Sequence, residues 1–229
     1  MSRDHLLRES RKMPIEAVIF DYGNVISLPQ SVEHIRRMVQ LCGTPTKQFH
    51  ENYWKFRIAY DRGEFDGISY WDAVIAEMGG KPAQSSQVAQ LISSDIQSWL
   101  QINAGSLAWL KELHERGVRL AILSNMPPEI ARYIERHCDW AHCFDVMIFS
   151  CDIGCAKPSS AMYQECLTRL HLPASSALFL DDREENVTAA ISLGMHSLIF
   201  DNIEGIRLRV EQHFDLRKTT AAGNHTTIS

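Results

Sequence analysis

The 229-residue sequence lacks several features that would place it in a specialised class of protein. It has no apolar run long enough to span a bilayer and no C-x-x-C pair among its six cysteines. It also has no excess of positive charge, since its formal net charge is -5. These absences argue against membrane insertion, a disulfide scaffold and nucleic-acid binding. We therefore expect a globular cytoplasmic protein with a small-molecule partner; the sequence sets no oligomeric state.

Five short apolar runs predict strands that are buried on both faces. They are rich in Val, Ile, Leu and Phe and lack the polar alternation of a half-exposed strand. The predicted strands cover residues 17–21, 119–124, 146–150, 177–181 and 197–200. Helical patterns that begin near Pro127, Ser160 and Glu184 separate the last four. This alternation predicts an α/β fold with a doubly wound, Rossmann-like parallel sheet.

One long interval, residues 28–103, breaks this alternation because it carries several helical patterns and no convincing strand. We expect it to form a small inserted helical bundle, or cap. The α/β core would then consist of residues 15–27 and 104–214. Residues 1–14 and 215–229 are polar and aperiodic, and we expect them to be flexible tails.

Polar residues follow four of the predicted strands. They are Asp21 after the first, Ser124 and Asn125 after the second, Lys157 in the loop after the third, and Asp181 and Asp182 after the fourth. Each has an ordinary explanation as a helix cap or turn residue. In an open parallel sheet, however, reactive groups collect beyond the carboxyl ends of the strands. Together the four strand ends predict a single site.

These residues lie in four motifs that occur in the order "VIFDYGNVI", "AILSN", "GCAKPSSAMY" and "LFLDDREENVTAA". Over residues 15–200 the sequence resembles the haloacid dehalogenase superfamily. It is particularly similar to the branch with a helical cap inserted after the first motif. That branch includes sugar-phosphate phosphatases and the phosphatase domain of soluble epoxide hydrolases. The D-x-G-N-V form also resembles a bacterial phosphatase that acts on glucose 1-phosphate.

The resemblance implies a covalent mechanism with Asp21 as the nucleophile. A carboxylate nucleophile divides hydrolysis into two steps through an aspartyl-phosphate, and positioning and charge stabilisation supply most of the catalysis. The family pattern makes Asp21, Ser124 and Lys157 the catalytic residues. Ser124, the backbone N–H of Asn125 and Lys157 are expected to bind the phosphate.

The resemblance also implies a cation, since a bare carboxylate repels a dianionic phosphate. Mg²⁺ prefers oxygen ligands and is the expected cofactor. The family pattern assigns it to Asp21, Asp182 and the backbone carbonyl of Gly23. Asp181 and Asn186 are expected to orient these ligands, and the choice of Asp182 over Asp181 rests on the resemblance alone.

Gly23 departs from the family pattern, in which most phosphatases carry a second aspartate at this position as general acid and base. Such assistance is worth about 10²–10⁴ in rate. Three explanations stay open: a leaving group that departs unassisted, an acid delivered by the cap, or a protein that only binds phosphate. A cap loop with Asp61, Glu64 and Asp66 offers such acids, although a polar turn is its more ordinary explanation.

The sequence therefore predicts a Mg²⁺-dependent phosphatase that hydrolyses a small phosphorylated metabolite, a sugar phosphate or similar. One alternative is a 2-haloacid dehalogenase, which would use Asp21 without a metal. It would want an arginine and apolar residues around the substrate carboxylate. Arg57 and Arg62 of the expected cap are candidates for this role, although surface arginines are usually solvated. The other alternative is a catalytically weakened phosphate-binding protein. The physiological substrate and the motion of the cap stay open.

Overall fold

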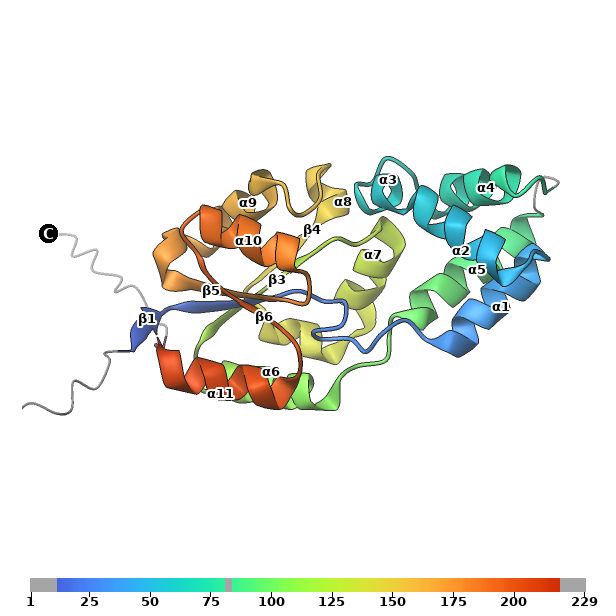
Figure 1. The fold of residues 1–229 in the computed structure, drawn as a ribbon. Helices are drawn as coiled ribbons and strands as arrows, with labels where there is room; N and C mark the ends of the chain where they lie inside the picture. The colour runs from blue at the N-terminus through green and yellow to red at the C-terminus, as the bar shows by residue number, and fades with distance from the viewer. Residues whose placement is uncertain (1–11, 81–83, 219–229) are drawn as a thin grey trace, which may run out of the picture.

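A five-stranded sheet forms the centre of the larger of two units (Figure 1). The computed structural model of the protein describes residues 12–80 and 84–218. The strand order is β4-β3-β2-β5-β6, and all neighbouring strands are parallel. The strands are β2 (Ala17–Phe20), β3 (Arg119–Ser124), β4 (Val146–Phe149), β5 (Ala177–Asp181) and β6 (His196–Ile199). The predicted doubly wound sheet is confirmed, with every strand end within one residue of its expected position.

Helices cover both faces of this sheet because successive residues of a buried strand point to opposite sides. In β2, Val18 and Phe20 face one apolar cluster, whereas Ala17 and Ile19 face another. The first cluster is completed by α6 (Ala104–Glu115), α7 (Pro128–His137), the 3-10 helix η1 (Asp139–Cys143) and α11 (Ile203–His213). The second is completed by α9 (Ser160–Leu170) and α10 (Glu184–Ser192). Close packing in both clusters holds the strands, and with them the strand ends, in fixed positions.

The second unit, called the cap from here on, contains helices and no strand among its described residues. Its helices are α1 (Val32–Cys42), α2 (Thr46–Lys55), α3 (Arg57–Asp61), α4 (Gly67–Glu77) and α5 (Ser85–Ser98). They enclose an apolar cluster of their own, which includes Phe49, Tyr53 and Trp71. In the part of the chain that the structure describes, no helix is long and apolar enough to cross a membrane.

The chain passes between the two units twice, and the two passages lie side by side. Ser27 and Ile102 form an antiparallel bridge, and the Leu28 N–H donates to the Gln101 carbonyl over 2.7 Å. A second contact involves α8 (Ser150–Ile153), where the Ser150 hydroxyl donates to the Asp61 carbonyl of the cap. The cap thus contacts the α/β unit at two places, the paired passages and α8.

Two short strands lie in ranges where the sequence predicted flexible tails. Strand β1 (Met13–Ile15) pairs in parallel with β7 (Phe214–Leu216), and the Arg217 N–H donates to the Ile15 carbonyl over 2.8 Å. This pairing corrects the expectation for residues 13–14 and 215–216. Strands of three residues give no periodic signal, and their partners are distant in the sequence. The rest of the expected tails, residues 1–11 and 219–229, lies outside the described residues.

The contact between the cap and α8 predicts an unequal effect of two glycine substitutions. Gly63 and Gly43 both have a positive φ, 72° and 63°. A Cβ at Gly63 would lie 2.7 Å from the Cys151 carbonyl oxygen, whereas a Cβ at Gly43 meets nothing within 4 Å. Gly43→Ala should cost about 1 kcal/mol through backbone strain alone. Gly63→Ala should cost about 1–3 kcal/mol more through the overlap.

Chemical denaturation of the two variants measures this difference. Equal free energies of unfolding for Gly63→Ala and Gly43→Ala would contradict the close approach of the cap to α8.

Candidate active site

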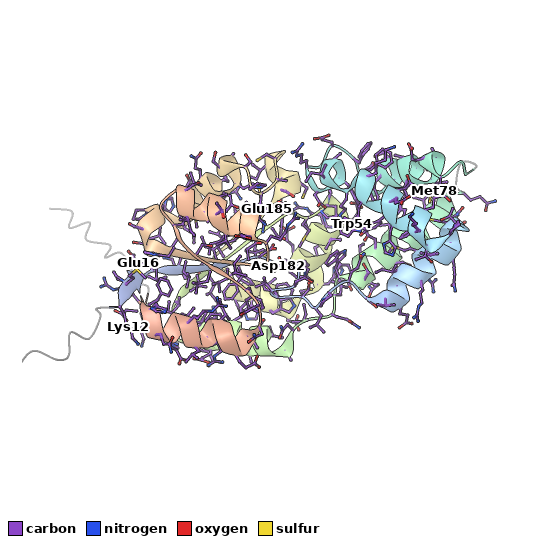
Figure 2. All side chains as sticks on the ribbon, in the orientation of Figure 1. Lys12, Glu16, Trp54, Met78, Asp182 and Glu185 are labelled. Atoms are coloured by element: carbon purple, nitrogen blue, oxygen red, sulfur yellow. The ribbon has the colours of Figure 1, made fainter. Side chains whose placement is uncertain are left out.

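The polar strand ends meet in one cavity of about 290 Å³ between the α/β unit and the cap. Figure 2 labels Asp182 and Trp54, which line it from the α/β unit and from the cap respectively. Seven of the eight predicted site residues of the strand ends line this cavity: Asp21, Gly23, Ser124, Asn125, Lys157, Asp182 and Asn186. Asp181, the eighth, is fully buried and ion-paired to Lys157. The structure therefore brings the predicted residues together.

Lys157 is the central charge of the site. Its ammonium Nζ lies 2.8 Å from Asp21 Oδ1 and 2.6 Å from Asp181 Oδ2, and only 1% of its side chain is exposed. Burial by itself lowers the pKa of a lysine, but the two carboxylates outweigh this effect and raise the pKa of Lys157. The side chain is therefore a fixed positive charge beside the Asp21 carboxylate.

The Asn125 side chain holds the loop that carries Lys157. Asn125 Oδ1 accepts from the Lys157 backbone N–H over 2.7 Å, and Asn125 Nδ2 donates to the Lys157 carbonyl over 3.1 Å. Sequence reasoning assigned Asn125 only a backbone contact with phosphate. The reciprocal amide pair joins the end of β3 to the loop after β4, and no spacing in the sequence reveals it.

The two adjacent aspartates after β5 have different surroundings. Both oxygens of Asp181 are occupied, by Lys157 Nζ, by the Arg183 N–H and by Asn186 Nδ2 at 2.9 and 3.0 Å. Asp182 instead lines the cavity, and its Oδ2 accepts from Asn24 Nδ2 over 2.8 Å. Asp181 thus fixes Lys157 and Asn186, whereas Asp182 presents its carboxylate to the cavity.

The oxygen atoms at this edge of the sheet suit a hard divalent cation. One carboxylate oxygen from each of Asp21, Asp181 and Asp182 lies within 4.8 Å of the other two. Asn186 Oδ1 is a buried acceptor without a hydrogen-bond partner among the described residues. Carboxylate and amide oxygens are the ligands that Mg²⁺ prefers. The donor set therefore fits the cofactor expected from the sequence.

Comparison with known proteins agrees with this geometry. The profile of the haloacid dehalogenase-like hydrolases matches residues 15–194. The chain belongs to this family. It is 26% identical to a sesquiterpene phosphatase of Aspergillus oryzae, over 80% of this chain and 88% of that protein. It is also 26% identical to a phosphatase of Mycobacterium tuberculosis, over 82% and 88%.

A solved structure shows the same fold. It is an enzyme of the haloacid dehalogenase family from Bacteroides thetaiotaomicron, in complex with magnesium and inorganic phosphate. The TM-score is 0.66 at 17% identity, and the alignment covers 81% of this chain and 93% of that one. The α/β core of the present chain is therefore that of a haloacid dehalogenase-like hydrolase.

At Gly23, where most phosphatases of the haloacid dehalogenase superfamily carry an acid, this chain places an indole beside the backbone. A Cβ added at Gly23 would lie 3.7 Å from Trp99 Cζ3, an ordinary van der Waals contact. The Trp99 carbonyl accepts from the Tyr22 hydroxyl over 2.8 Å. The space beyond the missing side chain is thus bounded by an aromatic ring from the end of α5.

Asn24 adopts a left-handed conformation, with a φ of 58°, and orients Asp182 through the bond described above. Asparagine tolerates this conformation better than most residues. The Gly-Asn pair in the first motif is typical of turns and favours this conformation of Asn24. No local pattern indicates that the Asn24 side chain binds Asp182.

Arg57 corrects the expectation of a solvated surface arginine. It lines the cavity with only 7% of its side chain exposed. Its Nε donates to Asp61 Oδ1 over 2.8 Å, and its other contacts are Asp95 Oδ2 at 3.3 Å and the Tyr53 hydroxyl. The side chain of Arg62, by contrast, is 43% exposed. The two arginines therefore differ in burial, since Arg57 is buried beside the cap core and Arg62 is exposed. The sequence pattern did not reveal this difference.

Of the three cap acids, only Asp61 lines the cavity. The Asp66 side chain accepts from the Ser69 hydroxyl and from the Ser69 N–H, and these bonds lower the pKa of Asp66 and cap α4. Glu64 is exposed and lies 3.8 Å from Arg62. Burial raises the pKa of Asp61, and the charge of Arg57 opposes this rise. The loop that carries Glu64 and Asp66 is therefore a polar turn that caps α4, which was the more ordinary explanation of its sequence.

The burial of Asp21 predicts a stability effect. Burial raises the pKa of Asp21 from 3.8 to about 6, Lys157 opposes the rise and Asp181 adds to it. The folded protein thus binds this proton more tightly than the unfolded chain, so the stability it contributes is lost as pH rises from about 4 through 6. Asp21→Asn, which is permanently neutral, should stabilise the metal-free protein at pH 7.5 by about 1–3 kcal/mol.

Chemical denaturation in the presence of EDTA measures this effect. The exposed Asp72→Asn is the matched control, with an expected change within about 0.5 kcal/mol. A destabilised Asp21→Asn protein at pH 7.5 would show that the ionised carboxylate is favourable in the folded state.

Proposed function

We propose that the protein is a Mg²⁺-dependent phosphatase that hydrolyses a small phosphate monoester through an aspartyl-phosphate on Asp21. The observation that carries the proposal is the buried Lys157, ion-paired to Asp21 in a cavity that Ser124 and Asp182 also line. A nucleophilic carboxylate, a fixed cation and free oxygen ligands are what phosphoryl transfer requires. Relatives named as phosphatases support the same class of reaction.

In the first step, Asp21 attacks phosphorus while the bond from phosphorus to the ester oxygen breaks. Lys157 is placed to stabilise the charge on the phosphoryl oxygens, and the Ser124 hydroxyl and the Asn125 N–H are the proposed donors to them. When bound, Mg²⁺ would be held by Asp21, Asp182 and the Gly23 carbonyl, and it neutralises charge between the phosphate and the nucleophile.

In the second step, a water molecule attacks the phosphorus of the aspartyl-phosphate. The bond from phosphorus to the Asp21 oxygen breaks, inorganic phosphate leaves and the Asp21 carboxylate is regenerated. One ester and one water thus give one alcohol and one phosphate. Burial of the site keeps the positions of Asp21 and Lys157 fixed through both steps.

Asp21→Asn should abolish phosphate release, with a loss of about 10³-fold or more. The measurement is a phosphate-release screen over a panel of monoesters, with and without Mg²⁺, alongside chloride release from a 2-haloacid. The surface variant Asp72→Asn should keep full activity. Turnover that survives in Asp21→Asn would contradict a covalent mechanism, and metal-independent chloride release would favour a dehalogenase.

The Asn24 bond to Asp182 predicts a change in cation affinity. Asn24→Gly keeps the left-handed backbone but removes the hydrogen bond to Asp182. Loss of a residue that orients a metal ligand typically weakens metal binding by about 10–100-fold. The Mg²⁺ concentration that half-maximally stabilises the protein against heat should rise accordingly. His171→Gly, at a second left-handed position with a φ of 53°, controls for the backbone effect. An unchanged midpoint in Asn24→Gly would remove Asn24 from the cation site.

A further inference from the structure

The first observation is that each carboxylate lining the cavity already has a partner or another proposed role. Among the described residues, these carboxylates are Asp21, Asp182 and Asp61. Asp21 is the proposed nucleophile and Asp182 a proposed cation ligand. The Asp61 carboxylate is engaged by Arg57, whose Nε lies 2.8 Å from Asp61 Oδ1. This ion pair gives Asp61 a partner within the cap.

The cationic side chains are no better as acids. Lys157 Nζ is held between two carboxylates, 2.8 Å from Asp21 Oδ1 and 2.6 Å from Asp181 Oδ2. Arginine side chains, here Arg57 and Arg183, do not deprotonate in proteins. A leaving group in this cavity therefore departs with its negative charge, and its own acidity controls the rate of the first step.

The second observation is that much of the cavity wall is apolar. Trp54, Ile58 and Trp99 line it from the cap, and Met126 and Ile130 line it from the α/β unit. Trp54 and Ile58 are 52% and 47% exposed, large values for apolar side chains beside a catalytic site. A bound apolar group would cover both, which is favourable at about 25 cal/mol per Å² of surface removed from water.

The charged groups that line the cavity from the cap, Arg57 and Asp61, are paired with each other. Arg57 Nε and Nη1 donate to Asp61, Asp95 and the Tyr53 hydroxyl. A sugar would bring several hydroxyls to this surface, and each hydroxyl buried without a partner loses its bonds to water. The lining thus disfavours a polyhydroxylated leaving group.

Gly23 joins the two observations. The glycine removes the usual acid, and the ring of Trp99 lies 3.7 Å from where its Cβ would be. An aromatic ring beside the scissile bond favours a planar apolar group, which can stack on it or meet its edge. A glycine at position 23 therefore supplies no proton donor and leaves the Trp99 ring beside the backbone.

We propose that the substrate is an aryl phosphate monoester, whose leaving group is a phenol, and this assignment rests on the phosphatase function proposed above. Phenols ionise near pH 10, as the tyrosine side chain does, and are far more acidic than aliphatic alcohols. Asp21 attacks phosphorus, the bond from phosphorus to the aryl oxygen breaks, and its electron pair leaves with the phenolate. The phenolate then takes a proton from water in the solvent. The ring is seated between Trp99 and the Trp54–Ile58 surface.

The test measures kcat/KM for Mg²⁺-dependent phosphate release, because this ratio reports the first step. The substrates are phenyl phosphates with substituents that change the acidity of the phenol, cyclohexyl phosphate, and glucose 6-phosphate. The ratio kcat/KM should fall steeply as the pKa of the phenol rises. Cyclohexyl phosphate, with a ring of the same size, should be at least about 10²-fold poorer than phenyl phosphate.

Two results overturn the proposal while leaving the phosphatase intact. One is a kcat/KM that does not depend on the acidity of the leaving group, and the other is a preference for glucose 6-phosphate over phenyl phosphate. A dependence that becomes steeper in Asp61→Asn would identify Asp61 as the acid and also overturn it. Phosphate release from none of the esters would instead overturn the proposed function itself.

The apolar surface is tested with a matched pair of cap isoleucines. Ile58 lines the cavity, whereas Ile68, 59% exposed at the start of α4, does not. Ile58→Ala should raise KM for phenyl phosphate about fivefold to tenfold with little change in kcat. Ile68→Ala should leave both unchanged. Equal KM values in the two variants would show that the ring does not contact this surface.

Discussion

The ion pairs of Lys157 with Asp21 and Asp181 are the interaction on which the rest of the site depends. Three charged groups are buried together at the carboxyl ends of the strands. Such a cluster persists only if its members are held on all sides. Asn125 holds the Lys157 loop, and Asn186 holds Asp181. The two carboxylates differ in their surroundings. Asp181 is fully buried with partners at both oxygens, whereas Asp21 lines the cavity with Lys157 Nζ and the Tyr22 N–H as its partners.

The cap supplies the other half of the cavity by different means. Its helices have their own apolar core, and its position over the strand ends is set by the paired passages at 27–28 and 101–102 and by the contact with α8. What it presents to the site is an apolar surface bordered by the buried Arg57 cluster. In the function proposed above, the core carries the reacting groups, and the cap contacts the group attached to the phosphate.

The sequence predicted the sheet, and the structure places the predicted site residues close together, because both depend on local patterns. Buried parallel strands are continuous apolar runs, and the residues that follow them must lie at one edge of the sheet. The pairing of β1 with β7 and the burial of Arg57 were missed because they depend on contacts between distant segments. For the same reason the sequence could not assign different roles to Asp181 and Asp182. These adjacent residues differ in where their side chains point. Lys157 and Asn186 bind Asp181, and Asn24 binds Asp182.

Gly23 lies where the α/β unit meets the cap: it carries no acid, and Trp99 Cζ3 lies 3.7 Å from where its Cβ would be. The account as a whole still depends on one covalent event at Asp21. Rapid acid quenching during turnover of phenyl phosphate, followed by mass analysis of the peptides, tests this event most directly. The account predicts one phosphoryl group on the peptide that contains Asp21, absent in Asp21→Asn. Full turnover with no phosphorylated peptide at any time after mixing would contradict it.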